Sequence, residues 1–226
     1  MMPLGRSSAQ QNQLRFAELR RTVGDRKALW IAPLWAMTKR YLVIIRNLTD
    51  VSDLPVAYSA YTCHGLESSS PAELVSFDRR LSEAEIDGRI AAGQICEIWR
   101  LDSRIVHFRW LSTVRVSLPF LGLDFEPLAG DLLLFEVFTL ADKRVRGIHT
   151  NVARHSLRRA SDGGFQRMVA LCAWWNAPAL RVAEKNGFKI AGAVTRWQLG
   201  PVATFSTSRS VQVQGKTLSV LESRDD

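Results

Sequence analysis

The sequence has few cysteines and no closely spaced pair of them. Only three are present, Cys63, Cys96 and Cys172, and none forms a CxxC motif. Structural zinc sites and small disulfide-linked folds depend on such spaced sets. The sequence therefore argues against both classes, and we expect a protein without a bound metal in a reducing, cytoplasmic setting.

Long uninterrupted apolar runs are also absent. The most apolar N-terminal stretch, residues 28–45, is broken by Pro33 and by the polar residues 38–40. A transmembrane helix needs about 20 continuous apolar residues, and a secretory signal needs a small-residue cleavage site that is not found here. We therefore expect neither a membrane-spanning helix nor a signal peptide.

Acidic residues are scarce in two regions of a chain whose net charge is +8. Residues 1–50 carry nine Lys/Arg against three acids, and residues 142–167 carry seven against two. Two basic surfaces that attract anions are expected. No aromatic stacking platform accompanies them, so a nucleic acid is not the expected partner.

What is present is ordinary globular material, 226 residues of which 46% are hydrophobic. A loop-like region over residues 49–71 ends in the run Ser68-Ser69-Ser70-Pro71, which is typical of a boundary. We predict an N-terminal arm over residues 1–70, one domain over 71–221 and a short tail over 222–226. A homodimer is left open by the sequence.

The arm combines basic and apolar residues between positions 14 and 46. One interpretation is an amphipathic helix at the inner face of a membrane, with Trp30 and Trp35 at the interface. The other is a helix and a strand packed on the domain, with residues 41–46 (YLVIIR) as the strand. Pro33 interrupts any long interfacial helix and favours the second interpretation.

A helix and a hairpin open the domain. Ser82 and Glu85 have the spacing of a capping box, and Gly93 ends the predicted helix. Residues 95–101 and 105–114 alternate in polarity as paired strands do. Three polar side chains of the second strand are expected to point away from the core: His107, Arg109 and Ser112. Three further strands are expected to complete the sheet: residues 189–199, 203–213 and 216–221.

The central feature is an almost wholly apolar strand over residues 132–140 (LLLFEVFTL), as expected for a strand covered on both faces. Glu136 is its only charge, and an unpaired buried carboxylate would be costly. One interpretation is a salt bridge with Arg109 or Arg115. The other is a general base whose proton affinity is raised by apolar surroundings.

A basic turn over residues 143–150 follows this strand and leads into a predicted helix over 150–160 and a second buried strand over 167–174. The first N–H groups of a helix have no partners within it, and with the helix dipole they form a site for anions. Gly147 allows a phosphate to approach the backbone closely. The sequence thus predicts a phosphate site at this turn.

Two motifs here resemble those of the GNAT superfamily of N-acyltransferases. Arg144-x-x-Gly147-x-His149 is similar to the pyrophosphate-binding motif Q/R-x-x-G-x-G/A. The segment from Asn176 to Gly187-Phe188 is similar to the second motif, an Asn after the fifth strand followed by a helix and Gly-Phe. The resemblance covers residues 81–199. It implies an α+β fold with a GNAT-like mixed, splayed sheet flanked by helices, here with a basic N-terminal arm.

The resemblance also implies a site for an acyl-CoA donor in the gap between the two buried strands. The implied donor-binding residues are Val137, Phe138, Thr139, Leu140, Arg144, Val145, Arg146, Gly147, Ile148, His149, Thr150 and Asn176. The implied chemistry is direct attack of an amine on the thioester, with the oxyanion held by backbone N–H near Val137 or Phe138 and Glu136 as the catalytic base. Asn176 also fits a plain helix N-cap, and the two roles are compatible.

Two positions depart from the family pattern. His149 stands where the phosphate motif has Gly or Ala, and Ala183 stands where many members have a Tyr that protonates the leaving thiolate. A thiol pKa near 8.5 makes the thiolate a tolerable leaving group without that acid.

The expected function is transfer of an acetyl group from acetyl-CoA to an amine of a small molecule or cell-envelope precursor, such as an amino sugar. One alternative is a longer acyl donor on CoA or acyl carrier protein. The other is a non-catalytic CoA-binding sensor or interaction module, which the missing Tyr favours.

Overall fold

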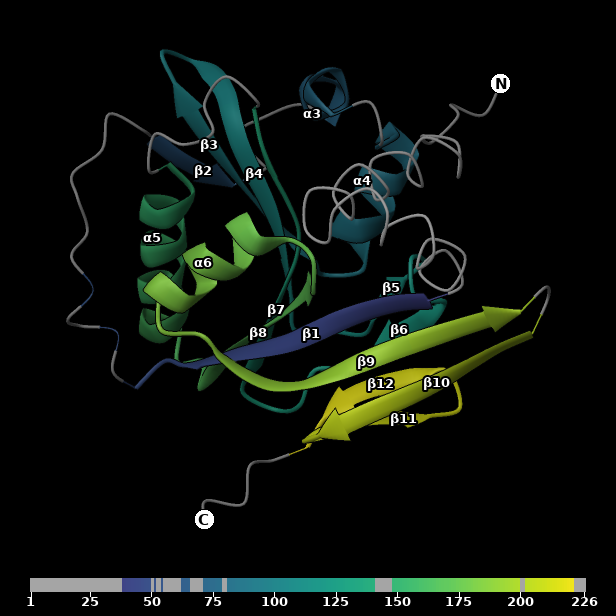
Figure 1. Cartoon of the computed structure of the whole chain (residues 1–226). Coiled ribbons are helices and arrows are strands. Elements are labelled where there is room, and N and C mark those ends of the chain that lie inside the picture. The colour runs from purple at the N-terminus through teal and green to yellow at the C-terminus, as the bar shows by residue number, and fades with distance from the viewer. Residues whose placement is uncertain are drawn as a thin grey trace, which may run out of the picture.

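The computed structural model describes residues 38–49, 51, 54, 62–65, 71–78, 81–140, 148–199 and 202–221 (Figure 1). Within these residues the helices are α3 Pro71–Phe77, α4 Glu83–Ala91, α5 Ile148–Asp162 and α6 Ala177–Lys185. The strands are β1 Thr38–Asn47, β2 Thr62–Gly65, β3 Ile95–Leu101, β4 Arg104–Ser112, β5 Val116–Leu118, β6 Leu123–Phe125, β7 Asp131–Thr139, β8 Arg167–Ala173, β9 Lys189–Leu199, β10 Val202–Arg209, β11 Val211–Gln214 and β12 Thr217–Val220.

Two sheets organise the described part of the chain. The large sheet has eight strands in the order β10-β9-β1-β8-β7-β4-β3-β2, and the small sheet has four in the order β11-β12-β6-β5. In the large sheet β7 and β8 run parallel, whereas the other neighbouring strands are antiparallel. The large sheet is therefore mixed, and its parallel pair lies near the middle.

Strand β1 lies inside the large sheet rather than at its border. It pairs with β8 on one edge and with β9 on the other, so that Tyr41 lies opposite Ala173 and opposite Val194. The strand predicted over residues 41–46 is thus confirmed, and it is longer than expected. The possible membrane-facing helix lies mainly in residues 1–37, which are outside the described residues.

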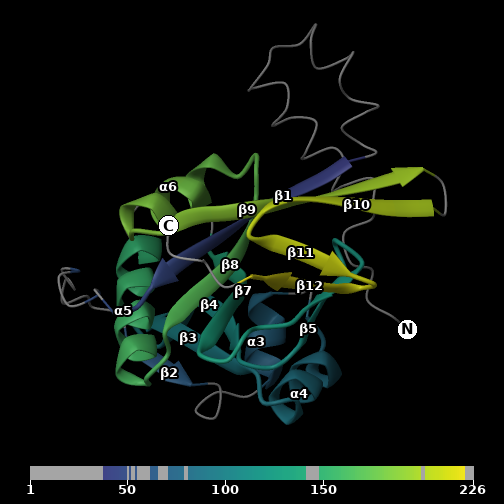
Figure 2. The same ribbon diagram turned by 90° about the horizontal axis from the view of Figure 1, so that it is seen from below.

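Different layers cover the two faces of the large sheet. On one face, α5 and α6 pack their apolar sides onto the strands, with Leu157 against Met168 and Leu180 against Cys172 (Figures 1 and 2). On the other face, α3 and α4 cover β3 and β4, and the small sheet covers β1, β8 and β9. Because both faces of the large sheet are covered, β7 needs apolar residues on both of its faces.

Local signals in the sequence account for the first helix and hairpin of the domain. The hydroxyl of Ser82 accepts a hydrogen bond from the Glu85 backbone N–H at 3.2 Å, and Gly93 has a φ of 79° just after α4. Asp102 and Ser103, with φ of 50° and 66°, form the tight turn between β3 and β4. The predicted cap and hairpin are confirmed.

The polar side chains of β4 were expected to point away from the core, but they are buried. His107, Arg109 and Ser112 are 0%, 1% and 1% exposed. His107 and Arg109 lie on the same side of β4 as Leu111, which packs with Leu157 of α5, whereas Ser112 lies on the opposite side together with Trp110. That expectation was wrong because α5 comes from a distant part of the chain.

The C-terminal strands also differ in part from expectation. The single strand expected over residues 203–213 is divided at Ser210 into β10 and β11, and Arg209 has a φ of 57° at the break. Strands β11 and β12 then join the small sheet instead of completing the large one. A β-carbon on Gly192 of β9 would lie only 2.2 Å from the Ser208 carbonyl oxygen of β10. The close approach of these two strands therefore requires glycine at position 192.

Candidate acyl-donor site

Strands β7 and β8 pair over only part of their length. The pairs run from Asp131 opposite Arg167 to Leu134 opposite Ala170, and no further pair joins the two strands in the described residues. Strand β7 continues to Thr139 and β8 to Ala173. Their facing edges beyond this point therefore carry backbone groups that are not used in a ladder, as predicted for a splayed sheet.

A β-bulge in β7 begins just where the pairing with β8 stops. Phe135 lies opposite Trp110 and Phe138 opposite Phe108, so two residues of β7 face one residue of β4. Glu136, one of the two, has a φ of 47°, which is rare for a residue with a β-carbon. Such a backbone persists only when the surroundings hold it. No local signal predicts this bulge, because the sequence contains no Gly or Asn at these positions.

The bulge determines which backbone groups of β7 face the opening. After it, the Leu140 N–H donates to the Val106 carbonyl at 3.1 Å, so Leu140 is bonded to β4. In an antiparallel ladder alternate residues turn their N–H and C=O groups to opposite edges. The backbone groups of Val137 and Thr139 are thereby directed away from β4, toward the edge that faces β8.

Glu136 is paired with an arginine from α4. Arg89 donates to both carboxylate oxygens of Glu136, at 2.7 and 3.0 Å, and to Glu85 at 2.8 Å. The Arg89 guanidinium also lies 5.0 Å from the ring centre of Trp110 and 5.6 Å from that of Phe135. Burial acts to lower the pKa of Arg89, but the carboxylates of Glu136 and Glu85 outweigh this effect. The pKa of Arg89 is therefore raised, and its guanidinium stays positively charged.

The salt-bridge interpretation of Glu136 is confirmed, but its expected partners were wrong. Arg109 is buried on the opposite face of the sheet, and Arg115 pairs with Glu126 at 2.5 Å. The Glu136 side chain is 40% exposed, so it is more open to solvent than the largely apolar surroundings expected from the sequence would make it. The four-residue spacing of Glu85 and Arg89 was the one available signal for this cluster. A catalytic role for Glu136 stays a prediction.

Helix α5 begins beside the end of β7. Val152, in its second turn, packs with Trp99, Val106 and Leu140. No acidic side chain occupies the first turn, so none competes for its free N–H groups. The helix predicted over residues 150–160 is confirmed and extends from Ile148 to Asp162.

The basic turn before α5 lies outside the described residues. Arg144, Val145, Arg146 and Gly147 lie outside the described residues, as do the side chains of Ile148 and His149. Two of the helix arginines have intramolecular partners, since Arg158 donates to the Leu54 carbonyl at 2.9 Å and Arg159 lies 3.4 Å from Glu97. The phosphate site at this turn stays a prediction.

Asn176 caps α6 at the end of the opening. Its side-chain oxygen accepts a hydrogen bond from the Ala179 N–H at 3.3 Å, so the predicted N-cap is confirmed. Its contact with the donor stays a prediction. Ala183 packs among apolar residues that include Ile44 and Phe188.

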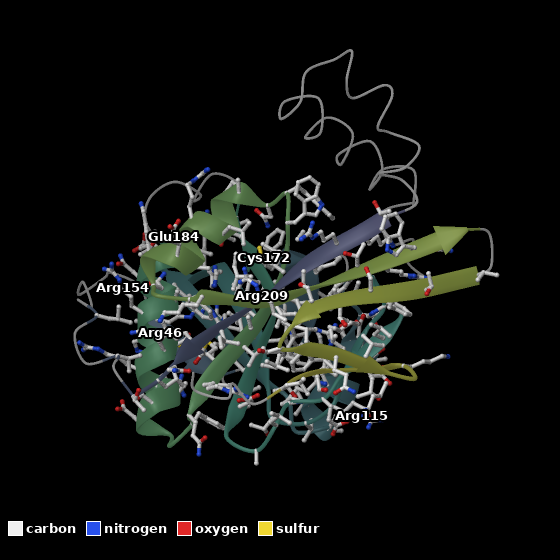
Figure 3. The ribbon with its side chains drawn as sticks, turned by 60° about the horizontal axis from the view of Figure 1, so that its bottom comes forward. Arg46, Arg115, Arg154, Cys172, Glu184 and Arg209 are labelled. Atoms are coloured by element: carbon white, nitrogen blue, oxygen red, sulfur yellow. The ribbon has the colours of Figure 1, made fainter. Side chains whose placement is uncertain are left out.

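Cys172 lies on the β8 side of the opening, beneath α6 (Figure 3). Burial raises the pKa of its thiol to about 11, so the thiol is protonated at neutral pH and is a poor nucleophile. Among the described side chains, no three His, Cys, Asp or Glu converge in a way that could hold a metal ion. No described helix is long and apolar enough to cross a membrane.

Comparisons with known proteins support the fold and leave the activity open. No family model matches the sequence, and no curated protein matches it. Solved structures do resemble it. One, from Novosphingobium aromaticivorans and described as a GNAT-family acetyltransferase, is 17% identical over 76% of this chain and 66% of its own, with a TM-score of 0.49. This chain thus spans slightly less than two thirds of that protein.

Two further structures show the range of likeness. A conserved protein of unknown function from Staphylococcus epidermidis is 8% identical over 86% of this chain and 80% of its own, with a TM-score of 0.51. The aminoglycoside N-acetyltransferase AAC(6')-Iy in complex with CoA is 18% identical over 57% of this chain and 91% of its own, with a TM-score of 0.45. The described fold is a mixed sheet that splays between β7 and β8, as the resemblance of the two sequence motifs implied.

Proposed function

We propose that this protein is an N-acyltransferase that transfers an acetyl group from acetyl-CoA to an amine. The observation that carries the proposal is the opening between β7 and β8 beyond Leu134 and Ala170, with the start of α5 beside the end of β7. An extended pantetheine could pair with the edge of β7 that faces β8, while the helix N–H groups and the preceding basic turn receive the pyrophosphate. The start of α5, where we propose that the phosphates bind, lies beside the end of β7.

The chemistry follows from the same geometry. The amine nitrogen attacks the thioester carbonyl, the carbonyl π electrons move onto oxygen, and the oxyanion accepts a hydrogen bond from the Val137 N–H. When the intermediate collapses, the C–S bond breaks and the thiolate leaves with the electron pair. The proton lost by the amine passes to solvent or to Glu136, directly or through water.

Glu136 has two roles open to it within this proposal. Because Arg89 already donates to both of its carboxylate oxygens, Glu136 can act as a base only through its exposed lone pairs or after Arg89 moves. In the second role it holds the bulge in shape and thereby directs the Val137 N–H. In both roles Glu136 contributes to the transfer reaction, but only as a base does it take up a proton.

The acceptor is an amine of a small molecule or cell-envelope precursor, with an amino sugar as the class to test first. A longer acyl chain on CoA or on acyl carrier protein remains the alternative donor. A CoA-binding sensor without turnover is the alternative function, and it is favoured by Ala183, which cannot protonate a thiolate and sits in an apolar cluster.

A thiol-release assay with acetyl-CoA and a panel of amines tests the proposal. Amino sugars, polyamines, peptides and aminoglycosides are compared at equal concentration, with calorimetry of acetyl-CoA binding alongside. Release of CoA that depends on one class of amine is the expected result. Binding without release for every amine favours the sensor, and no binding at millimolar acetyl-CoA contradicts the whole proposal. Gly147→Trp is the matched binding-deficient control.

A further inference from the structure

A cluster of buried polar side chains lies between α5 and the β3–β4 hairpin, and the proposed transfer reaction does not use it. Four of its members are at most 3% exposed: Glu97, His107, Arg109 and Ser156. Removing such groups from water is costly unless they are bonded to one another. The cluster therefore needs a structural or functional reason.

One part of the cluster ties α5 to the sheet. Glu97 of β3 accepts a short hydrogen bond from the Ser156 hydroxyl and lies 3.4 Å from the Arg159 guanidinium. Glu97 is also directly opposite Arg109 in the β3–β4 ladder. Burial lowers the pKa of Arg109 to about 10, against the opposing effect of Glu97, so Arg109 is still a cation at neutral pH.

The other part is a chain of hydrogen bonds from Arg109 through His107 to Thr139. An Arg109 terminal nitrogen lies 3.2 Å from His107 Nε2, and His107 Nδ1 lies 2.7 Å from Thr139 Oγ1. A guanidinium can only donate, so Nε2 must accept and the ring hydrogen must be on Nδ1. His107 is thus held as the neutral tautomer that donates to Thr139.

Thr139 is placed where this constraint bears on the donor site. It is the last residue of β7, five positions beyond the last residue paired with β8. Its side chain faces His107 across the ladder, whereas its backbone N–H and C=O are directed to the opening. Holding the side chain therefore holds the backbone groups that an extended donor would meet.

We propose that Arg109 and His107 are positioning residues that fix Thr139 for binding of the pantetheine arm of the acyl donor. The inference rests on the proposed function, because it assumes an acyl-CoA in the opening. Arg109 selects the tautomer of His107, and His107 anchors the end of β7 in the conformation that pairs with the donor. A group held in its binding geometry before the ligand arrives loses less entropy when the ligand binds.

Two donors of different length separate this role from a general structural one. Acetyl-CoA contacts both the opening and the phosphate site, whereas S-acetylpantetheine lacks the nucleotide and reaches only the opening. Binding of both is measured by calorimetry, or as KM and kcat where an acceptor is known. The proteins compared are the wild type, Thr139→Val, which keeps the shape, and Thr139→Ser, which keeps the hydroxyl.

The expected result for Thr139→Val is affinity about tenfold lower for both donors, as for loss of one hydrogen bond. Thr139→Ser is expected to bind both donors within about twofold of the wild type, since its hydroxyl still accepts from His107. His107→Leu is expected to reproduce the Thr139→Val effect. His107→Gln, whose amide can both accept and donate, is expected to recover part of it.

Three results would overturn the inference. The first is that Thr139→Val binds both donors as tightly as the wild type. The second is that Thr139→Val binds acetyl-CoA more weakly but S-acetylpantetheine normally. The third is that Thr139→Ser loses as much donor affinity as Thr139→Val. If His107→Leu fails to fold, the Thr139 pair still decides. Failure of the wild type to bind acetyl-CoA contradicts the proposed function itself, whereas normal binding by wild type and Thr139→Val contradicts only the positioning role.

Discussion

Residues 131–134 and 135–139 belong to the same strand, β7, but among the described strands the first segment has neighbours on both edges and the second on one. The first segment pairs with β4 through Leu133 and Leu134 and with β8 throughout, and Asp131, Leu132 and Leu133 are buried. The second segment contains the bulge at Glu136 and, of the described strands, pairs with β4. The same run of apolar residues thus builds the core in one half and borders an opening in the other.

The difference shows that apolar composition alone does not assign a strand to the core. LLLFEVFTL is nearly uniform in hydrophobicity, yet the segment changes character at Glu136. The change comes from partners on other elements, namely the end of pairing with β8, Arg89 on α4 and His107 on β4. We therefore expect changes in the first segment to alter stability and changes in the second segment to alter binding or turnover.

The largest expected effect is on stability, from the first segment. Leu133 is 0% exposed, so Leu133→Ala leaves a cavity and is expected to lower the free energy of unfolding by about 2–5 kcal/mol. Chemical denaturation measures it. Val202→Ala is the control, because Val202 is 68% exposed and its truncation should change stability by less than about 0.5 kcal/mol. If folded Leu133→Ala protein binds acetyl-CoA with altered affinity, the first segment also affects binding, which contradicts the difference between the two segments.

The next effect is on turnover, from the second segment. If Glu136 takes up the proton of the amine, Glu136→Gln is expected to lower kcat about 100-fold near neutral pH. The amide can still accept a hydrogen bond from Arg89, so the bulge should survive. Glu126→Gln is the matched control, because Glu126 forms an exposed pair with Arg115. Arg115 lies on the far side of the molecule from Arg154 of α5 (Figure 3).

Turnover by Glu136→Gln that equals the wild type across the pH range would show that Glu136 is not the base. The salt bridge with Arg89 would then account for the residue. A loss of turnover accompanied by a large loss of thermal stability would instead show that the bulge had collapsed.

The smallest effect concerns acid stability and lies outside β7. Arg100 donates to both carboxylate oxygens of Glu73, at 2.5 and 2.6 Å, and thereby lowers the pKa of Glu73 from its usual 4.5. A group with a lowered folded-state pKa stabilises the protein above its unfolded pKa, and this contribution is lost as the pH falls below about 4.5. Because the pair is partly exposed, Glu73→Gln should remove less than about 1 kcal/mol.

Melting temperatures of the wild type and Glu73→Gln between pH 3 and 7 measure that effect. The two curves should converge at the acid end and separate toward neutral pH. A constant difference over the whole range would contradict the assigned pKa shift and would point to lost packing instead.

Much of the fold could be predicted from the sequence because its signals are local. Each of four predicted features depends on residues within a few positions of one another: the Ser82 cap, the Asp102-Ser103 turn, the helix after the basic turn and the cap at Asn176. The opening between β7 and β8 was predicted from the resemblance of two motifs to a known family, not from periodicity.

The rest depends on contacts between distant segments. The bulge at Glu136 has no local signal, and its partner Arg89 is 47 residues away in the sequence. His107 and Arg109 look like exposed alternating residues until α5 covers them. The central place of β1 is likewise set by its pairing with β8, more than 120 residues later. The resemblance therefore predicted the opening between β7 and β8, but not the side chains that border it.

Backbone amide hydrogen exchange, with and without saturating acetyl-CoA, tests the donor site most directly. Amides of residues 131–134 should exchange slowly in both states, because they already belong to a two-sided ladder. The amide of Val137 should exchange readily in the free protein and be protected by acetyl-CoA. Unchanged exchange over residues 135–140 at millimolar acetyl-CoA, or protection confined to other segments, would contradict binding of the donor between β7 and β8.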